Sequence, residues 1–411
     1  MLCQFTFKNF KSYRDETVFD LQATKVDEHS DSLLSCAGDK RKYISTSVIY
    51  GPNAGGKSGV IEALTSLVSF VMSPIELMSE VPKQKLSMRF VECPPFAFDN
   101  VSQNMPTEFT LYFQQNESEF RYTLFLQDGN VVSESLFRKG IGAKNPAKIF
   151  TRDLDGVQLG ASLHNKKSIN MNVNSSMPYI SFLAISYNYE IISSAIEWFS
   201  KCICINYAIT NPNNFISSHP SKKNSVLAML KDVNIPISDY FVKTIIDEKT
   251  GEKLHDTLQV EREINGHKYN LNISEESRGT IKLFGIFPLV LAALSEGRLF
   301  VADELDASLH PKLLRYIIKL FKDKSINKHN AQLIFTSHDI TTMKNDLFRR
   351  DEIWFAVKDD DGASEIYSLY EIRNKDGSHV KSTAPFDKQY LEGRYGADPY
   401  LSEMLSTNWE E

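Results

Sequence analysis

A glycine-rich run that ends in lysine and serine occupies residues 51–58, where the sequence is G-P-N-A-G-G-K-S. It matches the pattern G-x-x-x-x-G-K-[ST], in which backbone N–H groups and the start of a helix bind the phosphates of a nucleotide. The apolar spacing predicts a strand at 47–50 and an amphipathic helix after the run, as this motif requires. We therefore expect nucleotide contacts from Asn53, Ala54, Gly55, Gly56, Lys57 and Ser58.

The last two residues of this run have separate expected roles. Lys57 would reach the β- and γ-phosphates, and the hydroxyl of Ser58 would bind Mg²⁺. The alternative is a glycine-rich turn that caps an ordinary helix. Such a turn needs neither a lysine nor a serine directly after its last glycine, so nucleotide binding is favoured.

Two adjacent carboxylates follow a second apolar strand, predicted at 299–302. Like charges at the end of a buried strand are costly unless a cation or a ligand compensates them. A purely structural pair is the less favoured alternative. We expect Asp303 to hold Mg²⁺ through water and Glu304 to polarise the water that attacks the nucleotide.

Two further segments flank these carboxylates. Upstream, Ser277 and Gly279 lie at the predicted start of a long apolar helix, where a phosphate could bind. Downstream, His338 ends a predicted buried strand at 332–338 and could touch a γ-phosphate. Each segment alone is equally consistent with a helix or strand cap, but their order along the chain is specific.

That order resembles the head of ABC-type ATPases, in the branch that contains SMC and RecF-like proteins. Residues 5–13 resemble the opening strand and turn of this branch, and 308–311 resemble its D-loop. The motifs of this family correspond to Walker A at 51–58, Walker B at 303–306, the signature at 277–279 and the switch histidine at 338. The resemblance covers most of 1–75 and 270–360.

The resemblance implies a homodimer that encloses two ATP molecules. Ser277 and Gly279 would then contact the nucleotide held by the partner, while Glu304 and His338 would act catalytically on their own side. Two features depart from the family pattern. The signature lacks the usual leading leucine and double glycine, and residues 93–99 contain no glutamine for the Q-loop.

The expected fold is α/β, an ABC-type P-loop head with a mixed sheet core and an antiparallel side sheet. Alternating apolar residues at 107–137 predict the antiparallel strands. We expect an N-terminal lobe at 1–140, a mainly helical insertion or lid with a β hairpin at 141–270, and a C-terminal lobe at 271–411. Sustained heptads are missing, so no long coiled coil is expected.

Composition indicates a soluble globular protein, because 42% of the 411 residues are hydrophobic and 24% are charged. The net charge of −6 argues against a protein that coats nucleic acid by charge alone. We see no signal segment and no run of about 20 apolar residues, so we expect a cytoplasmic protein without a membrane helix. The five cysteines lack zinc-type spacing and are expected to be reduced.

The tail at 386–399 contains the run Y-L-E-G-R-Y-G-A. It could be an ordinary helix that a glycine turn closes. It also resembles the tail of bacterial stand-alone ABC ATPases from anti-phage and abortive-infection operons, of the AbiLi/RloA type. PtuA of Septu, AriA of PARIS and the OLD-type ATPase domains are looser relatives.

This resemblance implies an ATPase subunit of a defence system that holds or releases a separately encoded toxic or nuclease effector. A phage protein could be its trigger. No intrinsic nuclease is expected, because the stretch after His338 is too short for the nuclease domain of OLD-type relatives. Assembly beyond a dimer, DNA binding and the preference between ATP and GTP stay open.

The sequence also allows two other functions. The first is a RecF-like ATPase of DNA repair or recombination that clamps DNA. The second, the motor of a membrane importer, fits poorly because the stretch between Ser58 and Ser277 is too long.

Overall fold

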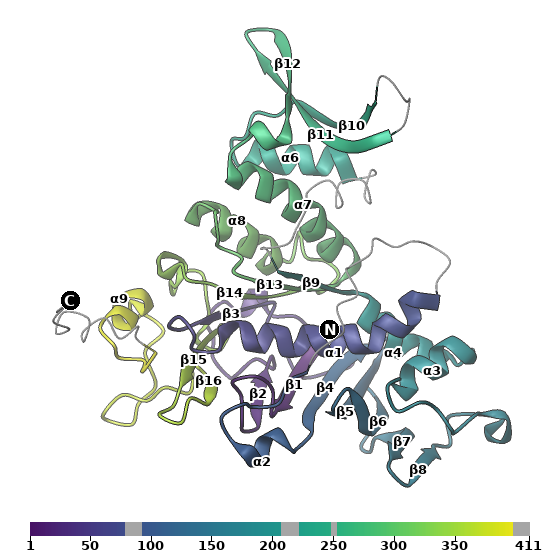
Figure 1. The fold of residues 1–411 in the computed structure, drawn as a ribbon. Coiled ribbons are helices and arrows are strands. Elements are labelled where there is room, and N and C mark those ends of the chain that lie inside the picture. Colours follow the sequence, from purple (N-terminus) through teal and green to yellow (C-terminus); the bar gives the residue numbers. More distant parts are fainter. Residues whose placement is uncertain (79–92, 207–221, 248–252, 398–411) are drawn as a thin grey trace, which may run out of the picture.

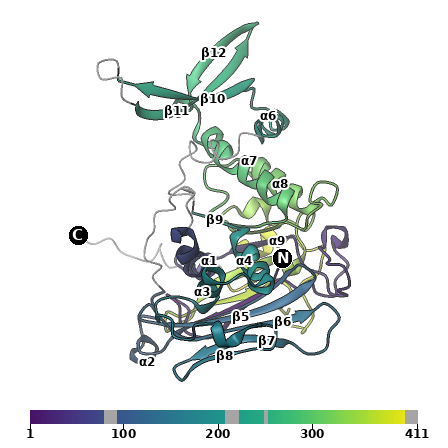
Figure 2. The same cartoon turned by 90° about the vertical axis from the view of Figure 1, so that its right-hand side faces the viewer.

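The computed structural model describes residues 1–78, 93–206, 222–247 and 253–397. Within these ranges the chain forms three sheets that stack in one direction, with helices between them (Figures 1 and 2). The expected α/β class with a side sheet is confirmed. Short elements outside the layers are α2 (Asn100–Gln103), α9 (Phe386–Leu391) and the 3₁₀ turns Ser30–Ser32, Lys166–Ser168, Ile273–Glu275, Ile340–Thr342 and Arg350–Glu352.

The central sheet has six strands in the order β16-β15-β3-β14-β13-β9. Five run parallel, and β16 pairs antiparallel with β15 at one edge. All residues of β3, β13 and β14 are buried, as expected for strands covered on both faces. Because the five strands run parallel, their carboxyl ends lie at the same edge of the sheet. The strands are β3 (Thr46–Tyr50), β9 (Cys202–Asn206), β13 (Leu299–Asp303), β14 (Gln332–Thr336), β15 (Ile353–Lys358) and β16 (Ser364–Ser368).

Helices cover both faces of the central sheet (Figure 1). On one face lie α1 (Lys57–Met78), α3 (Tyr179–Ser186) and α4 (Glu190–Ser200). On the other lie α7 (Arg278–Glu296) and α8 (Pro311–Lys322). The buried side chains form two separate large clusters, one for each face.

Two of these helices, α1 and α7, are long and apolar enough to span a membrane by length and composition. The expectation that no such run exists was therefore wrong. The physical reason is their burial, since each helix contributes its apolar side chains to one of the two core clusters. A helix that is packed between layers can be apolar around most of its circumference.

A seven-stranded antiparallel sheet lies beyond α1, in the order β2-β1-β4-β5-β6-β7-β8. Buried and partly exposed residues alternate along β5, so one face of this sheet packs on the helices. Phe113 of β4 stacks on Trp198 of α4 with ring centroids 4.6 Å apart. The strands are β1 (Leu2–Lys8), β2 (Thr17–Asp20), β4 (Thr107–Gln115), β5 (Ser118–Gln127), β6 (Asn130–Gly140), β7 (Ala147–Asp153) and β8 (Gly156–Leu159).

A three-stranded sheet projects from the opposite end of the molecule (Figures 1 and 2). It consists of β10 (Asp239–Ile246), β11 (Lys253–Ile264) and β12 (His267–Asn272), and α6 (Lys223–Asp232) lies beside it. Tyr240 packs edge-on against Phe284 of α7, with ring centroids 5.3 Å apart. The projecting sheet therefore rests on the helix that follows the signature residues.

The segment 141–270 is not the mainly helical insertion with a β hairpin that the sequence predicted. Its β7 and β8 complete the side sheet, β9 is an edge strand of the central sheet, and β10–β12 form the third sheet. The reason is long-range pairing, because β9 is held by a parallel register with β13, such as Cys204 opposite Val301. Such pairing leaves no local signal in the sequence.

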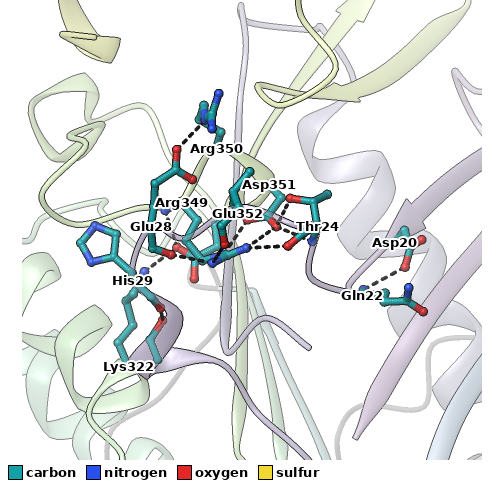
Figure 3. A network of polar contacts seen from close by, with 12 residues as sticks. Asp20, Gln22, Thr24, Glu28, His29, Lys322, Arg349, Arg350, Asp351 and Glu352 are labelled. Carbon is teal, nitrogen blue, oxygen red and sulfur yellow. Dashed lines mark hydrogen bonds and ion pairs between the residues drawn. The ribbon is translucent and has the colours of Figure 1, made fainter. Parts of the chain in front are cut away.

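A buried polar network joins the N-terminal segment to the start of β15 (Figure 3). Arg349 is fully buried and donates two hydrogen bonds of 2.8 Å to the carboxylate of Asp351. It also donates to the backbone carbonyls of Thr24 and Glu28. Beside it, Lys322 of α8 pairs with the buried carboxylate of Glu352. The network fixes β15 against the segment that follows the first two strands.

We predict that Arg349→Met lowers the free energy of unfolding by about 3–5 kcal/mol, because it leaves the carboxylate of Asp351 buried without its cation. Denaturant titration of the purified protein measures the change. Arg394→Met is the matched control, since Arg394 pairs with Glu392 on the surface, where an ion pair contributes about 0–1 kcal/mol. Equal changes in the two variants would contradict this account.

Candidate functional site

The glycine-rich run forms a tight loop between the end of β3 and the start of α1. Gly51 and Gly56 have φ angles of 144° and 113°, and Ala54 has a φ of 63°. A Cβ atom on Gly51 would lie only 2.1 Å from the carbonyl oxygen of Ala356 in β15. The loop is therefore seated on β15 so closely that only glycine fits. Asn53 and Ala54 are exposed at its tip, and Gly55 closes its turn with a hydrogen bond to Pro52.

Lys57 folds back over this loop. Its ammonium donates to the carbonyl oxygens of Gly51 at 3.0 Å and Pro52 at 2.9 Å, and the residue is 6% exposed. Burial lowers the pKa of Lys57, and the nearby carboxylates of Asp303 and Glu304 oppose this effect. A phosphate at the loop would place a further anion beside this buried ammonium.

Asp303 connects the first turn of α1 with the ends of two neighbouring strands. Its Oδ1 accepts hydrogen bonds from the hydroxyl of Ser58 at 3.1 Å and from that of Thr336 at 2.6 Å. The two residues that we expect to hold Mg²⁺ are therefore in direct contact, and hydroxyl and carboxylate oxygens suit this ion. No cluster of three acidic, histidine or cysteine ligands occurs in the part of the chain that the structure describes.

Thr336 was not singled out from the sequence. Besides donating to Asp303, its hydroxyl accepts a hydrogen bond of 2.7 Å from the backbone N–H of Glu304. The only signal was its position as the last residue of the strand before His338. This hydroxyl orients both predicted acidic residues at once.

Glu304 and His338 both lie exposed at the carboxyl edge of the central sheet. Glu304 has a φ of 49°, an uncommon conformation for a residue with a side chain, and such strain is concentrated at functional sites. The backbone N–H of His338 donates to Asp306 at 3.0 Å, which fixes the turn after β14. Both side chains are therefore on the same edge as the phosphate loop.

Ser277 and Gly279 lie elsewhere, at the start of α7 on the opposite face of the sheet from α1 (Figure 1). The hydroxyl of Ser277 accepts from the N–H of Thr280 at 3.2 Å, so it caps this helix. A Cβ on Gly279 would lie 3.1 Å from the carbonyl oxygen of Ser308. Gly279 thus packs on the loop after β13, whereas Ser277 is exposed to solvent.

The tail motif packs against the outer part of the central sheet. Phe355 of β15 stacks with Tyr390 and packs against Tyr395, with ring centroids 5.6 and 5.4 Å apart. The hydroxyl of Tyr367 in β16 donates to the carbonyl of Tyr395 at 2.6 Å. The tail residues up to 397 therefore support the strand on which the phosphate loop rests, whereas residues 398–399 of the motif lie outside the described part.

Residues 47–344 match the protein family described as "AAA domain, putative AbiEii toxin, Type IV TA system". The match begins in β3 and ends after the strand-end histidine, so it includes the phosphate loop, the signature residues, the carboxylate pair and His338, whereas the tail motif lies outside it. The chain belongs to this family. It is accordingly an ATPase of the P-loop type that binds ATP.

Two solved structures are among those to which the chain is similar. One is the SmcHead bound to the C-winged helix domain of ScpA, with 15% identity, a TM-score of 0.42, and coverage of 90% of this chain and 97% of that chain. The other is the recombination mediator protein RecF with ATPrS, with 12% identity, a TM-score of 0.33, and coverage of 90% and 98%. No curated protein matches the sequence.

We predict that Thr336→Val lowers ATP turnover about 10–100-fold, the range found when a group that orients a metal ligand is removed. ATP binding should change only slightly, because the contacts of Thr336 are to Asp303 and Glu304. Phosphate release and titration with a fluorescent ATP analogue measure the two quantities. Thr336→Ser keeps the hydroxyl and should retain most of the turnover, whereas a fully active valine variant would exclude this role.

Proposed function

We propose that this protein is the ATP-binding and hydrolysing subunit of a bacterial anti-phage, abortive-infection system and that it works as an ATP-dependent homodimer in the cytoplasm. The main support for a dimer is the position of Ser277. It caps an exposed helix start on the face of the sheet opposite α1, whose own start holds Lys57 and Ser58.

An exposed helix start is suited to bind an anion, because its N–H groups and its dipole both favour negative charge. In a dimer with twofold symmetry, each chain would present this start to the nucleotide on its partner's phosphate loop. Ser277 and Gly279 then complete a site whose other half is Lys57 and Ser58. Two ATP molecules would be enclosed in this way.

Within each half-site the residues divide the chemistry. Ser58 and Asp303 would hold Mg²⁺, which neutralises charge that develops on the phosphates. Glu304 orients and polarises the attacking water as a general base. His338 would report on the γ-phosphate, and the neighbouring positions of β14 and β3 in the sheet support this role.

The assignment to defence is supported by the family description, which names the AbiEii toxin and type IV toxin–antitoxin systems. The tail motif supports it too. In this proposal the ATP-bound dimer holds a separately encoded toxic or nuclease effector and releases it when a phage component is sensed. The RecF-like alternative, a DNA clamp in repair, is one outcome of the tests below.

Glu304→Gln should bind ATP, slow its hydrolysis at least about 100-fold by loss of the general base, and accumulate as a dimer. Light scattering after gel filtration, with and without ATP, measures the species. The double variant Glu304→Gln/Ser277→Arg should stay monomeric while it still binds ATP, because arginine blocks the contact with the partner's nucleotide. A dimer of normal stability in the double variant would overturn the composite site.

Lys57→Ala should abolish phage protection in cells that carry the whole operon, because the phosphate loop then lacks its cation. The control is Lys375→Ala, which removes an exposed lysine that belongs to none of the motifs. Affinity capture of the protein with the product of the neighbouring gene, with and without ATP, identifies the partner. An ATP-sensitive complex with a toxin or nuclease is the expected result, whereas hydrolysis stimulated by DNA alone would favour the repair function.

A further inference from the structure

Lys282 lies in the second turn of α7, five residues after Ser277, and contacts the loop that carries the general base. Its ammonium donates to the backbone carbonyl of Glu304 at 3.2 Å and also to that of Ala307. The motif pattern attached no role to this residue. Its side chain nevertheless holds the loop of Glu304 against α7, which we call the signature helix because it begins at the signature residues.

The loop from 304 to 308 is unusual in its backbone. Glu304 and Ser308 have φ angles of 49° and 61°, which side chains other than glycine adopt at a cost. Two hydrogen bonds close the loop, from the N–H of Ala307 to Glu304 and from that of Leu309 to Asp306. An ammonium that binds two carbonyl oxygens of one strained loop favours this conformation over more relaxed ones.

The position of the ammonium is itself costly. Burial lowers the pKa of Lys282 to about 8, while Asp306 and Glu304 oppose the effect. An uncharged residue would pack at this position without that cost. A second contact seats the same helix on the same loop, because Gly279 closely approaches the carbonyl of Ser308. Through these two contacts, a movement of the start of α7 would be coupled to a movement of the loop 304–308.

We propose that Lys282 is a positioning residue. Through it, the position of α7, the helix that begins at the signature residues, sets the orientation of Glu304. This inference rests on the proposed homodimer. Ser277 at the helix start would contact the partner's nucleotide, and Glu304 would act on the nucleotide of its own chain. Lys282 then links the two composite sites, so that hydrolysis on one side depends on closure over the other.

The helix start is also held from its other side. Arg262 of β11 forms two hydrogen bonds of 2.8 Å with the carboxylate of Glu276, the residue before Ser277. The signature residues therefore sit between a clamp from the projecting sheet and the contact of Lys282 with the loop. With contacts on both sides, a displacement of the start of α7 would also displace the loop that carries Glu304.

The test compares Lys282→Met with Lys282→Arg and with Lys319→Met, which removes an exposed lysine of α8. Lys282→Met should lower kcat about 10–100-fold with KM for ATP and nucleotide binding nearly unchanged. Lys282→Arg can still donate to both carbonyls and should restore kcat to within about threefold, because its guanidinium has several donors. Lys319→Met should equal the unsubstituted protein.

Dimer formation separates this inference from the proposed function. Glu304→Gln/Lys282→Met should still form the ATP-dependent dimer, because Lys282 touches the loop and not the nucleotide. If Glu304→Gln alone does not dimerise, the proposed function fails. If it dimerises while Lys282→Met turns over normally, or loses ATP binding, the positioning role is overturned. Should the methionine variant fail to fold, Lys282→Gln is used with the same expected split between kcat and KM.

Discussion

The hydrogen bonds to one oxygen of Asp303 hold the nucleotide site together. That oxygen joins the first turn of α1, through Ser58, to the end of β14, through Thr336. Since Thr336 also binds the backbone of Glu304, one hydroxyl determines where both carboxylates lie. Asp303 and Thr336 can meet because β13 and β14 are adjacent and parallel, so that both residues lie at the same edge of the sheet.

The wall behind the phosphate loop depends on residues far from it in sequence. Gly51 lies against the carbonyl of Ala356, so β15 determines how the loop can fold. The buried Arg349 fixes the start of β15 to the N-terminal segment, and the aromatic tail packs on Phe355 from the other side. Segments near both ends of the described chain therefore support the strand on which the phosphate loop rests.

The two faces of the central sheet carry different parts of the candidate site. The side with α1 and the seven-stranded sheet carries Lys57 and Ser58 of the phosphate loop. The side with α7 presents Ser277 to solvent and carries the projecting sheet (Figure 2).

The sequence by itself determined the local features of this protein. The phosphate loop, the carboxylate pair, the strand-end histidine and the antiparallel strands after Thr107 each depend on residues close together in the chain. Glycine, charge and apolar spacing specify such features directly. The α/β class and P-loop type of ATPase followed from their order.

Only the tertiary structure decided which distant segments meet. The sequence did not indicate that β9 belongs to the central sheet, that Thr336 orients Asp303 and Glu304, or that Lys282 reaches the carbonyl of Glu304. These contacts join residues separated by 22 or more positions, and the last involves a backbone oxygen that every residue possesses. Side-chain types identify which groups can react, but the packing of helices and strands sets which groups are neighbours.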